Sequence, residues 1–190
     1  MQKLIINHIR KFVNLTDDEI PVLLKYLKLQ SVKKRDYLLN EGQICKSMYF
    51  VEKGCLRMYF LNNKSAEQIT QFAIEGWWIS DYFGFNDHKV SEYYIQAIEK
   101  SEVYILDKQI INDLFAELPQ MERYFRIVMQ KTVAASQLRI KHLYDLSKEE
   151  LYNHFSVSFP EFMQRVPQYM IASYLGLTPE YVSELRKKKS

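Results

Sequence analysis

The sequence predicts an α+β protein with three parts in order. An N-terminal antiparallel β-roll of the double-stranded β-helix or jelly-roll type, with flanking helices, is followed by a long central helix and a C-terminal helix-turn-helix. Apolar residues recur at helical spacing in residues 3–28 and again from residue 108 onward. Between them, short runs rich in Tyr, Phe, Val, Ile and Met alternate with turn residues. Near the C-terminus, Gly176 and the pair Thr178-Pro179 separate two short helical patterns.

The composition is that of a folded globular protein. The chain has 190 residues, of which 47% are hydrophobic and 26% charged, and its formal net charge is +3. Positive charge gathers at one end, because residues 165–190 hold five basic and two acidic side chains. No apolar stretch approaches the roughly 20 residues of a membrane span, and the N-terminus shows no cleavage signature. We expect a cytoplasmic protein with no membrane partner.

Turn residues divide the region from Leu29 to Asp107 into strands. Gly and Asn accept positive φ, and they mark turns at Glu41-Gly42, Lys53-Gly54, Asn62-Asn63 and Glu75-Gly76. The runs between these turns predict strands at MYFVEK, CLRMYFL, QITQFAI, YYIQAI and EVYIL. Before this region, Thr16 and Glu19 form a capping-box pattern that predicts a helix over residues 17–26.

A single long helix is predicted between the roll and the C-terminal part. Pro119 suits its first turn, and no breaker follows until about Tyr144. A stripe with alternating four-residue and three-residue spacing is typical of paired helices. Its members are the predicted dimer contacts Met121, Phe125, Val128, Thr132 and Ala135. The alternative is an ordinary core helix that lies on the roll.

The last part fits a helix-turn-helix that starts at Gln168. Gly176 occupies the turn, where glycine adopts a left-handed conformation most cheaply. Thr178 is a suitable N-cap, and Pro179 suits the first helical position. The residues predicted to face inward are Ile171, Ala172, Leu175, Val182 and Leu185. The alternative is an αα-hairpin with a glycine turn and no role in DNA binding.

The second helix of this motif would present its polar side to the major groove of double-stranded DNA. The predicted DNA contacts are Gln168, Thr178, Pro179, Glu180, Ser183, Glu184, Lys187 and Lys188. Glu180 can accept a hydrogen bond from a cytosine amino group, whereas Glu184 adds a second negative charge near a polyanion. The basic residues 186–189 either contact phosphates or form a solvated chain end.

No constellation of catalytic or metal-binding residues stands out. The four histidines (8, 88, 142 and 154) are scattered and show no metal-ligand spacing. Cys45 and Cys55 are too few for a disulfide framework. They either form a redox pair or act as small core residues. We expect neither an enzyme nor a bound metal or cofactor.

With these residues in place, the chain resembles the Crp/Fnr family of bacterial transcription regulators over nearly its full length. The resemblance rests on YFVEKGCLRMYF, on Glu41-Gly42 and on FPEFMQRVPQYMIASYLGLTPEYVSELRKK, which is similar to the branch common in Bacteroidetes-type bacteria. It implies a cyclic-nucleotide-binding-like effector domain over residues 1–118, a dimerisation helix over 119–144 and a DNA-binding domain over 145–190. It also implies a homodimer in which ligand binding to the roll repositions two winged DNA readers.

The chain departs from the family's pattern in two places. Members that bind cyclic AMP use a Gly-Glu pair and an Arg-Ser/Thr-Ala run, but here those three positions fall on Ser91, Glu92 and Tyr93. Without the arginine, we expect no cyclic AMP binding in the usual way. An aromatic pocket for an unknown small-molecule effector is one alternative, and simple filling of the roll is the other. The residues of the predicted effector pocket are Trp78, Tyr82, Phe83, Ser91, Glu92 and Tyr93.

The second departure lies in the DNA-reading part. Close relatives often carry arginine where this chain has Glu184, and the sequence stops at Ser190, directly after the second helix. We therefore expect no C-terminal wing. The leading interpretation is a homodimeric DNA-binding transcription regulator. Its rival is a ligand-binding or protein-interaction module whose helix-turn-helix is structural only.

Overall fold

The computed structural model describes residues 3–87 and 89–187, which form two compact units. The first, here the roll unit, comprises Met1–Phe60 and Gln71–Met129. The second, here the helical unit, comprises Leu61–Thr70 and Gln130–Ser190. The central helix therefore runs through both units. The division at residues 118 and 144 inferred from the resemblance remains a proposal.

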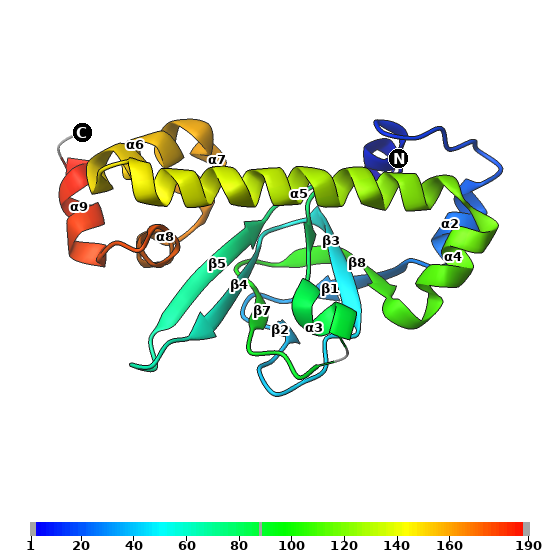
Figure 1. Ribbon diagram of the computed structural model, residues 1–190, viewed down its shortest axis with the longest axis horizontal. Coiled ribbons are helices and arrows are strands. Elements are labelled where there is room, and N and C mark those ends of the chain that lie inside the picture. The colour runs from blue at the N-terminus through cyan, green and yellow to red at the C-terminus, as the bar shows by residue number, and fades with distance from the viewer. Residues whose placement is uncertain (1–2, 88, 188–190) are drawn as a thin grey trace. The chain divides into compact units, whose positions relative to one another are not determined.

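The strands form two antiparallel sheets, which confirms the predicted jelly-roll architecture (Figure 1). One sheet has the strand order β1-β8-β3-β6 and the other β2-β7-β4-β5. The strands are β1 (Lys28–Val32), β2 (Tyr37–Leu39), β3 (Ser47–Lys53), β4 (Leu56–Leu61), β5 (Glu67–Ala73), β6 (Trp78–Ile79), β7 (Tyr94–Ala97) and β8 (Ser101–Asp107). Each of the five predicted runs contains a strand.

Glycines shape the turns of the roll as the sequence predicts. Gly42, Gly54 and Gly76 have φ values of 85°, 104° and 86°, in a region that side chains with a Cβ rarely adopt. Gly54 is also required by space, because a Cβ there would lie 2.2 Å from the hydroxyl oxygen of Ser101. The turn at Gly54 therefore admits no larger residue without a shift of β8.

Helices flank the strands of the roll. They are α1 (Leu4–Arg10), α2 (Ile20–Lys25), α3 (Tyr82–Asp87), the 3₁₀ turn η1 (Lys108–Ile110), α4 (Ile111–Glu117) and the first part of α5 (Gln120–Asp145). The carboxylate of Glu19 accepts from the Thr16 amide (2.8 Å), yet α2 begins only at Ile20, later than predicted. The sequence did not predict α3, where the side chain of Asp81 accepts from the amide of Gly84 (3.1 Å).

An aromatic cluster joins the roll to the first half of α5. The rings of Trp78 and Phe125 lie 5.2 Å apart, and the rings of Trp78 and Phe50 lie 5.4 Å apart. The indole N–H of Trp78 donates to the hydroxyl of Tyr124 (2.8 Å), which also contacts Nδ1 of His8 at 2.8 Å. Burial raises the pKa of the Tyr124 phenol above its usual range. The polar atoms in this cluster thus stabilise one another inside the core.

The helical unit contains the second half of α5 and four further helices. They are α6 (Lys148–Ser158), α7 (Pro160–Arg165), α8 (Gln168–Leu175) and α9 (Pro179–Lys187). The predicted capping box at the start of α6 is confirmed: the hydroxyl of Ser147 accepts from the Glu150 amide, and the Glu150 carboxylate accepts from the Ser147 amide. The structure describes no residue after Lys187, so the expectation about a wing lies outside the described residues.

In the described ranges, none of the helices combines the length and apolarity needed to cross a bilayer. Among the same residues, no cluster of three or more His, Cys, Asp or Glu side chains is arranged to hold a metal ion.

Two buried tyrosines in the roll unit give a matched test of the aromatic cluster. Tyr124→Phe should lower the free energy of unfolding by about 1–3 kcal/mol, because it leaves the indole N–H of Trp78 buried without its acceptor. Tyr104→Phe should be neutral or slightly stabilising, because the Tyr104 hydroxyl is buried and has no hydrogen-bond partner in the described part of the chain. Urea titrations of both variants measure the difference. Equal losses would show that the hydroxyl of Tyr124 does not stabilise the cluster.

Candidate nucleic-acid interface

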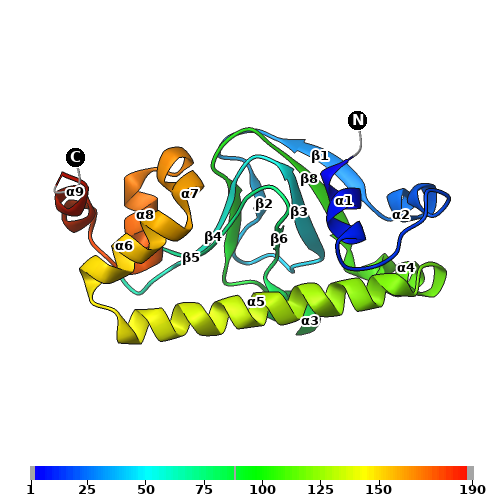
Figure 2. The ribbon, with the colours of Figure 1, turned by 90° about the horizontal axis from the view of Figure 1, so that it is seen from above.

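The turn between α8 and α9 is built by hydrogen bonds that close the end of α8. Gly176 adopts the left-handed conformation with φ 67° and ψ 29°. Its amide donates to the carbonyl of Ser173 (3.3 Å), and the amide of Leu177 donates to the carbonyl of Ala172 (2.9 Å). This pair of bonds is the Schellman motif, which glycine favours. The predicted role of Gly176 is confirmed, and the turn directs the chain into α9 (Figure 2).

The start of α9 is fixed by the predicted cap. The hydroxyl of Thr178 accepts from the Tyr181 amide (3.2 Å), and Pro179 occupies the first helical position. Val182 and Leu185 are 0% and 3% exposed. Burial of each of these side chains stabilises the unit by about 2 kcal/mol. These contacts set the rotation of α9 about its own axis.

The opposite side of α9 is polar and open to solvent. Glu180, Glu184 and Lys187 are exposed, and Ser183 between them is half-buried. They recur at three-residue and four-residue spacing, so they share one side of the helix. These four residues form the reading edge. Thr178 and Pro179 are exposed beside it.

Two other predicted DNA contacts are placed differently. Gln168 begins α8 and is half-buried, and its side-chain nitrogen is buried without a hydrogen-bond partner among the described residues. This side chain would have to rotate to reach a phosphate. Lys188 lies outside the described residues.

The structure places the predicted effector-pocket residues in different surroundings. Trp78 lies in the core beside α5, whereas Phe83 is 66% exposed. Ser91 is buried, and its hydroxyl accepts from the amide of Tyr93 (3.1 Å). Glu92 is exposed and Tyr82 is half-buried. Burial raises the pKa of both the Tyr82 and the Tyr93 phenol.

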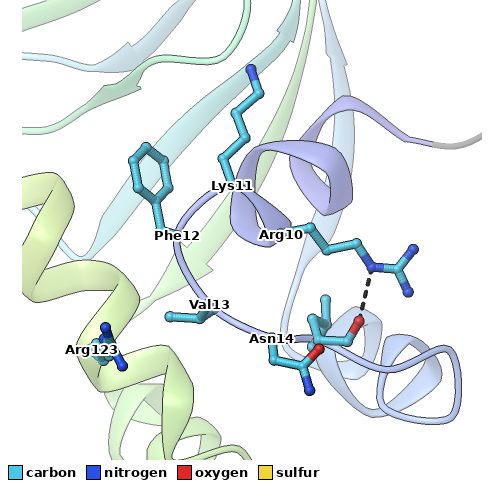
Figure 3. A pocket seen from close by; sticks show the side chains of 7 residues that line it. Arg10, Lys11, Phe12, Val13, Asn14 and Arg123 are labelled. Carbon is cyan, nitrogen blue, oxygen red and sulfur yellow. Dashed lines mark hydrogen bonds between the residues drawn. The ribbon is translucent and has the colours of Figure 1, made fainter.

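Two cavities in the roll unit are lined by other residues. A hollow of about 560 Å³ lies between α5 and the segment after α1, beside Lys11, Asn14 and Arg123 (Figure 3). Its labelled side chains point in different directions, and Arg10 is already engaged by Leu15 O (2.8 Å) and Asp17 (2.6 Å). Ligand sites need convergent polar groups, so this hollow is not a candidate.

The second cavity is small, at about 210 Å³, and is lined by residues of β1, β2, β3 and β8. Tyr37, Tyr49 and Asp107 are among them. None of the predicted effector residues lines either of these cavities. The alternative expectation, that the aromatic residues of this segment fill the roll, fits Trp78 but not the largely exposed Phe83.

Three residues of the predicted dimer stripe on α5 are buried within this chain. Met121, Phe125 and Val128 are 1%, 7% and 9% exposed and belong to the core of the roll unit. The roll of the same chain already covers them, so they are not available to a second chain. Thr132 is half-buried and Ala135 is exposed.

A second stripe with the same spacing lies one residue later along α5. Because a helix turns about 100° per residue, this shift moves the stripe away from the buried side of the helix, although its first member, Met129, still packs against the core of the roll unit. The later apolar members Val133, Ile140 and Leu143 are 57%, 54% and 42% exposed. The full set, here the outer stripe, is Met129, Val133, Ser136, Ile140 and Leu143. Its spacing of four, three, four and three residues is that of a coiled-coil seam.

Comparison with known proteins agrees with this architecture. Residues 29–118 match the family described as "Cyclic nucleotide-binding domain". The chain is 29% identical over 167 residues to the fumarate and nitrate reduction regulatory protein of Vibrio cholerae, covering 81% of this chain and 65% of that protein. It is 26% identical over 167 residues to the anaerobic regulatory protein of Haemophilus influenzae, covering 81% and 63%. The chain thus spans slightly less than two thirds of the length of these relatives.

Solved structures show the same fold. FixK2 from Bradyrhizobium japonicum superposes with a TM-score of 0.72 at 18% identity, covering 85% of this chain and 83% of that one. The catabolite activator protein of Thermus thermophilus gives a TM-score of 0.58 at 16% identity, covering 92% and 84%. Over 81% of its length the chain is thus similar to bacterial regulatory proteins, and residues 29–118 match the cyclic nucleotide-binding domain.

Proposed function

We propose that this chain is a DNA-binding transcription regulator of the Crp/Fnr type that acts in the cytoplasm as a homodimer, without enzymatic activity. The observation that carries the proposal is the reading edge on α9, which is polar and solvent-facing while Val182 and Leu185 hold the opposite side in the core. The run that begins FPEFMQ further suggests the branch common in Bacteroidetes-type bacteria.

The reading edge has groups for two kinds of DNA contact. Glu180 lies in the first turn of α9, where side chains of a recognition helix meet base edges. Its carboxylate can accept a hydrogen bond from the amino group of cytosine. Ser183 can contact a base or a phosphate, and Lys187 at the far end suits phosphate contact. Base specificity thus depends on the start of α9, and salt-dependent affinity on its end.

Glu184 favours the rival function. It is the second exposed acid on an edge that would meet a polyanion, and it weakens binding unless a cytosine or a cation faces it. In the rival, the chain is a ligand-binding or interaction module, and the helix-turn-helix is only structural. A DNA-binding measurement separates the two functions.

The outer stripe of α5 supports the homodimer. A parallel pairing of two α5 helices would bury Val133, Ile140 and Leu143, which are about half exposed in the single chain. The burial of such side chains drives helix pairing. A two-fold axis along this seam would present two α9 helices to half-sites about one helical turn of DNA apart.

In this proposal, the roll does not bind cyclic AMP through the usual phosphate cassette. Glu92 is exposed and stands where the phosphate cassette has its Ser/Thr residue. Its carboxylate would repel a phosphate. The Ser91 hydroxyl is occupied by the Tyr93 amide. The proposal includes an unidentified small-molecule effector. No cavity described above gathers the residues predicted to bind it.

DNA recognition is tested by enriching duplexes from a randomised library with the wild-type chain. We expect a two-fold symmetric site with cytosine at the position read by Glu180. Glu180→Gln should shift that preference towards adenine, since glutamine pairs with adenine in the major groove. Glu161→Gln on α7 removes one exposed acid away from the reading edge and should leave the preference unchanged. Recovery of only random duplexes by the wild-type chain would exclude this function and leave the rival.

The role of Lys187 is tested by the salt dependence of binding. Lys187→Ala should weaken binding to every duplex by a similar factor and reduce the slope of log K against log salt by about 1, as expected for one lost phosphate contact. Fluorescence anisotropy between low and moderate salt measures both quantities. An unchanged slope would mean that Lys187 does not contact a phosphate.

The dimer seam is tested by two matched variants of α5. Ile140→Glu places a charge within the outer stripe and should convert dimers to monomers, because a buried unpaired carboxylate is costly. Leu138→Glu changes a side chain that is also about half exposed, at 53% against 54%, but points away from the outer stripe. Sedimentation equilibrium should show a dimer for Leu138→Glu and a monomer for Ile140→Glu; monomer for both, or dimer for both, would remove the seam from the proposal.

A further inference from the structure

The tip of the β4–β5 hairpin, Leu61–Thr70, packs within the helical unit against the end of α8. The tip itself is ordered by Asn62, whose side-chain oxygen accepts from the amides of Lys64 (2.9 Å) and Ala66 (3.1 Å). Ser65 completes the turn with a positive φ of 56°. The hairpin therefore presents the start of β5 as a fixed strand rather than as a loose loop.

Ser173 of α8 occupies the position that a further strand would take beside β5. Its hydroxyl accepts from the amide of Ile69 (3.0 Å) and donates to the carbonyl of Glu67 (2.7 Å). β5 is the edge strand of its sheet, so its outer amide and carbonyl groups need partners from elsewhere. One side chain supplies both a donor and an acceptor to this edge.

Two further side chains bond to the carbonyls at the end of α8. The last carbonyls of any helix lack partners within the helix. Gln68 donates its side-chain amide to the carbonyl of Ser173. Arg139 of α5 donates through one nitrogen to the carbonyl of Tyr174 (2.9 Å) and through the other to that of Thr70 (2.7 Å). We call these contacts of Ser173, Gln68 and Arg139 the hairpin clamp.

The charge and the ring contacts strengthen the clamp. The guanidinium of Arg139 lies 4.1 Å from the centre of the Tyr174 ring, within cation–π range. A cation at the C-terminal end of α8 also interacts favourably with the helix dipole. Burial raises the pKa of the Tyr174 phenol, and the neighbouring Arg139 opposes this shift. The clamp thus joins α5, α8 and the hairpin through partly buried contacts.

The clamp leaves the reading edge free. With all of its contacts formed, Glu180, Glu184 and Lys187 remain exposed, so the clamp does not block DNA. Along the chain, α5 is joined to α6 through the short connection of Leu146 and Ser147, and the rings of His142 on α5 and His154 on α6 lie 4.2 Å apart. The clamp adds a direct attachment between α5 and α8, the first helix of the helix-turn-helix.

From this geometry we propose that Ser173 and Arg139 are positioning residues for DNA binding: they hold α8, and through it α9, at the orientation in which both readers of a dimer engage DNA together. The inference rests on the proposed function and adds to it the residues that set the orientation of α9. Binding to a single half-site needs one reader and no fixed orientation. Binding to two half-sites at once needs the fixed orientation, because the orientation sets the effective concentration of the second reader at the second half-site.

The test compares two duplexes taken from those that the wild-type chain enriches: one with both half-sites, and one with a half-site scrambled. Ser173→Ala and Arg139→Gln should each weaken binding to the complete duplex by on the order of tenfold. Their affinity for the single half-site should change by less than about twofold, because α9 itself is unaltered. A variant that had merely unfolded would lose both affinities together.

Matched controls separate the clamp from general effects. Ser156→Ala removes a helical serine hydroxyl that bonds within its own helix, to the carbonyl of Tyr152 (2.7 Å). Lys141→Gln removes the same charge as Arg139→Gln two residues along α5, where the lysine faces Asp145 at 3.7 Å. Both controls should bind the complete duplex as the wild-type chain does. Equal losses in the controls and the clamp variants would overturn the inference.

Hydrogen exchange at the Ile69 amide provides a readout that needs no variant of the clamp. Because coupling between two events is reciprocal, binding of the complete duplex to the wild-type chain should slow exchange at Ile69. Unchanged or faster exchange on binding would overturn the inference, as would unchanged or tighter binding of the complete duplex by Ser173→Ala. If the wild-type chain enriches no duplex at all, the proposed function itself fails, and the inference falls with it for that separate reason.

Discussion

The burial of Val182 and Leu185 is the constraint on which the candidate interface depends. These side chains are 0% and 3% exposed, and they leave α9 with one possible rotation about its axis. The Schellman turn at Gly176 and the cap at Thr178 fix where the helix begins. Together they place Glu180, Ser183, Glu184 and Lys187 on the solvent side. Without this core, the same sequence would be a polar helix with no defined reading edge.

The two halves of the 26-residue helix α5 make different contacts. Its first half buries Met121, Tyr124 and Phe125 in the roll unit, where an aromatic cluster and buried hydrogen bonds fix its position. Its second half carries an exposed apolar stripe and also provides Arg139, which bonds to the hairpin and to α8. One helix therefore combines core packing, the proposed dimer seam and the proposed positioning of the reader.

Local signals in the sequence predicted much of the fold. Some signals involve only residues that are close together in the sequence, so they can be recognised without a structure. They are the capping box at Ser147, the turn glycines and the helix start at Thr178-Pro179. The phase of the stripe on α5 was not readable, because two stripes one residue apart have the same spacing. Only the position of the roll shows that Met121, Phe125 and Val128 are buried within the chain.

Contacts between residues far apart in the chain could not be predicted from the sequence. Ser173 and Ile69 are 104 positions apart, and a serine in a helix gives no sign that its hydroxyl will meet an edge strand. The surroundings of the predicted effector residues were not readable for a related reason. A run of aromatic residues in the sequence does not show which way each side chain points: Trp78 in β6 is buried in the core, whereas Phe83 in α3 is 66% exposed.

The most direct test of the account asks whether the reading edge touches DNA. Cys45 and Cys55 are both fully buried, so a photo-crosslinker can be attached selectively to a single introduced cysteine. Ser183→Cys lies within the reading edge, and Val157→Cys lies on another helix, α6, at a position that is 78% exposed. The account predicts a crosslink to an enriched duplex from position 183 and none from position 157. Crosslinking from position 157 alone, or from neither position while the chain is bound, would contradict it.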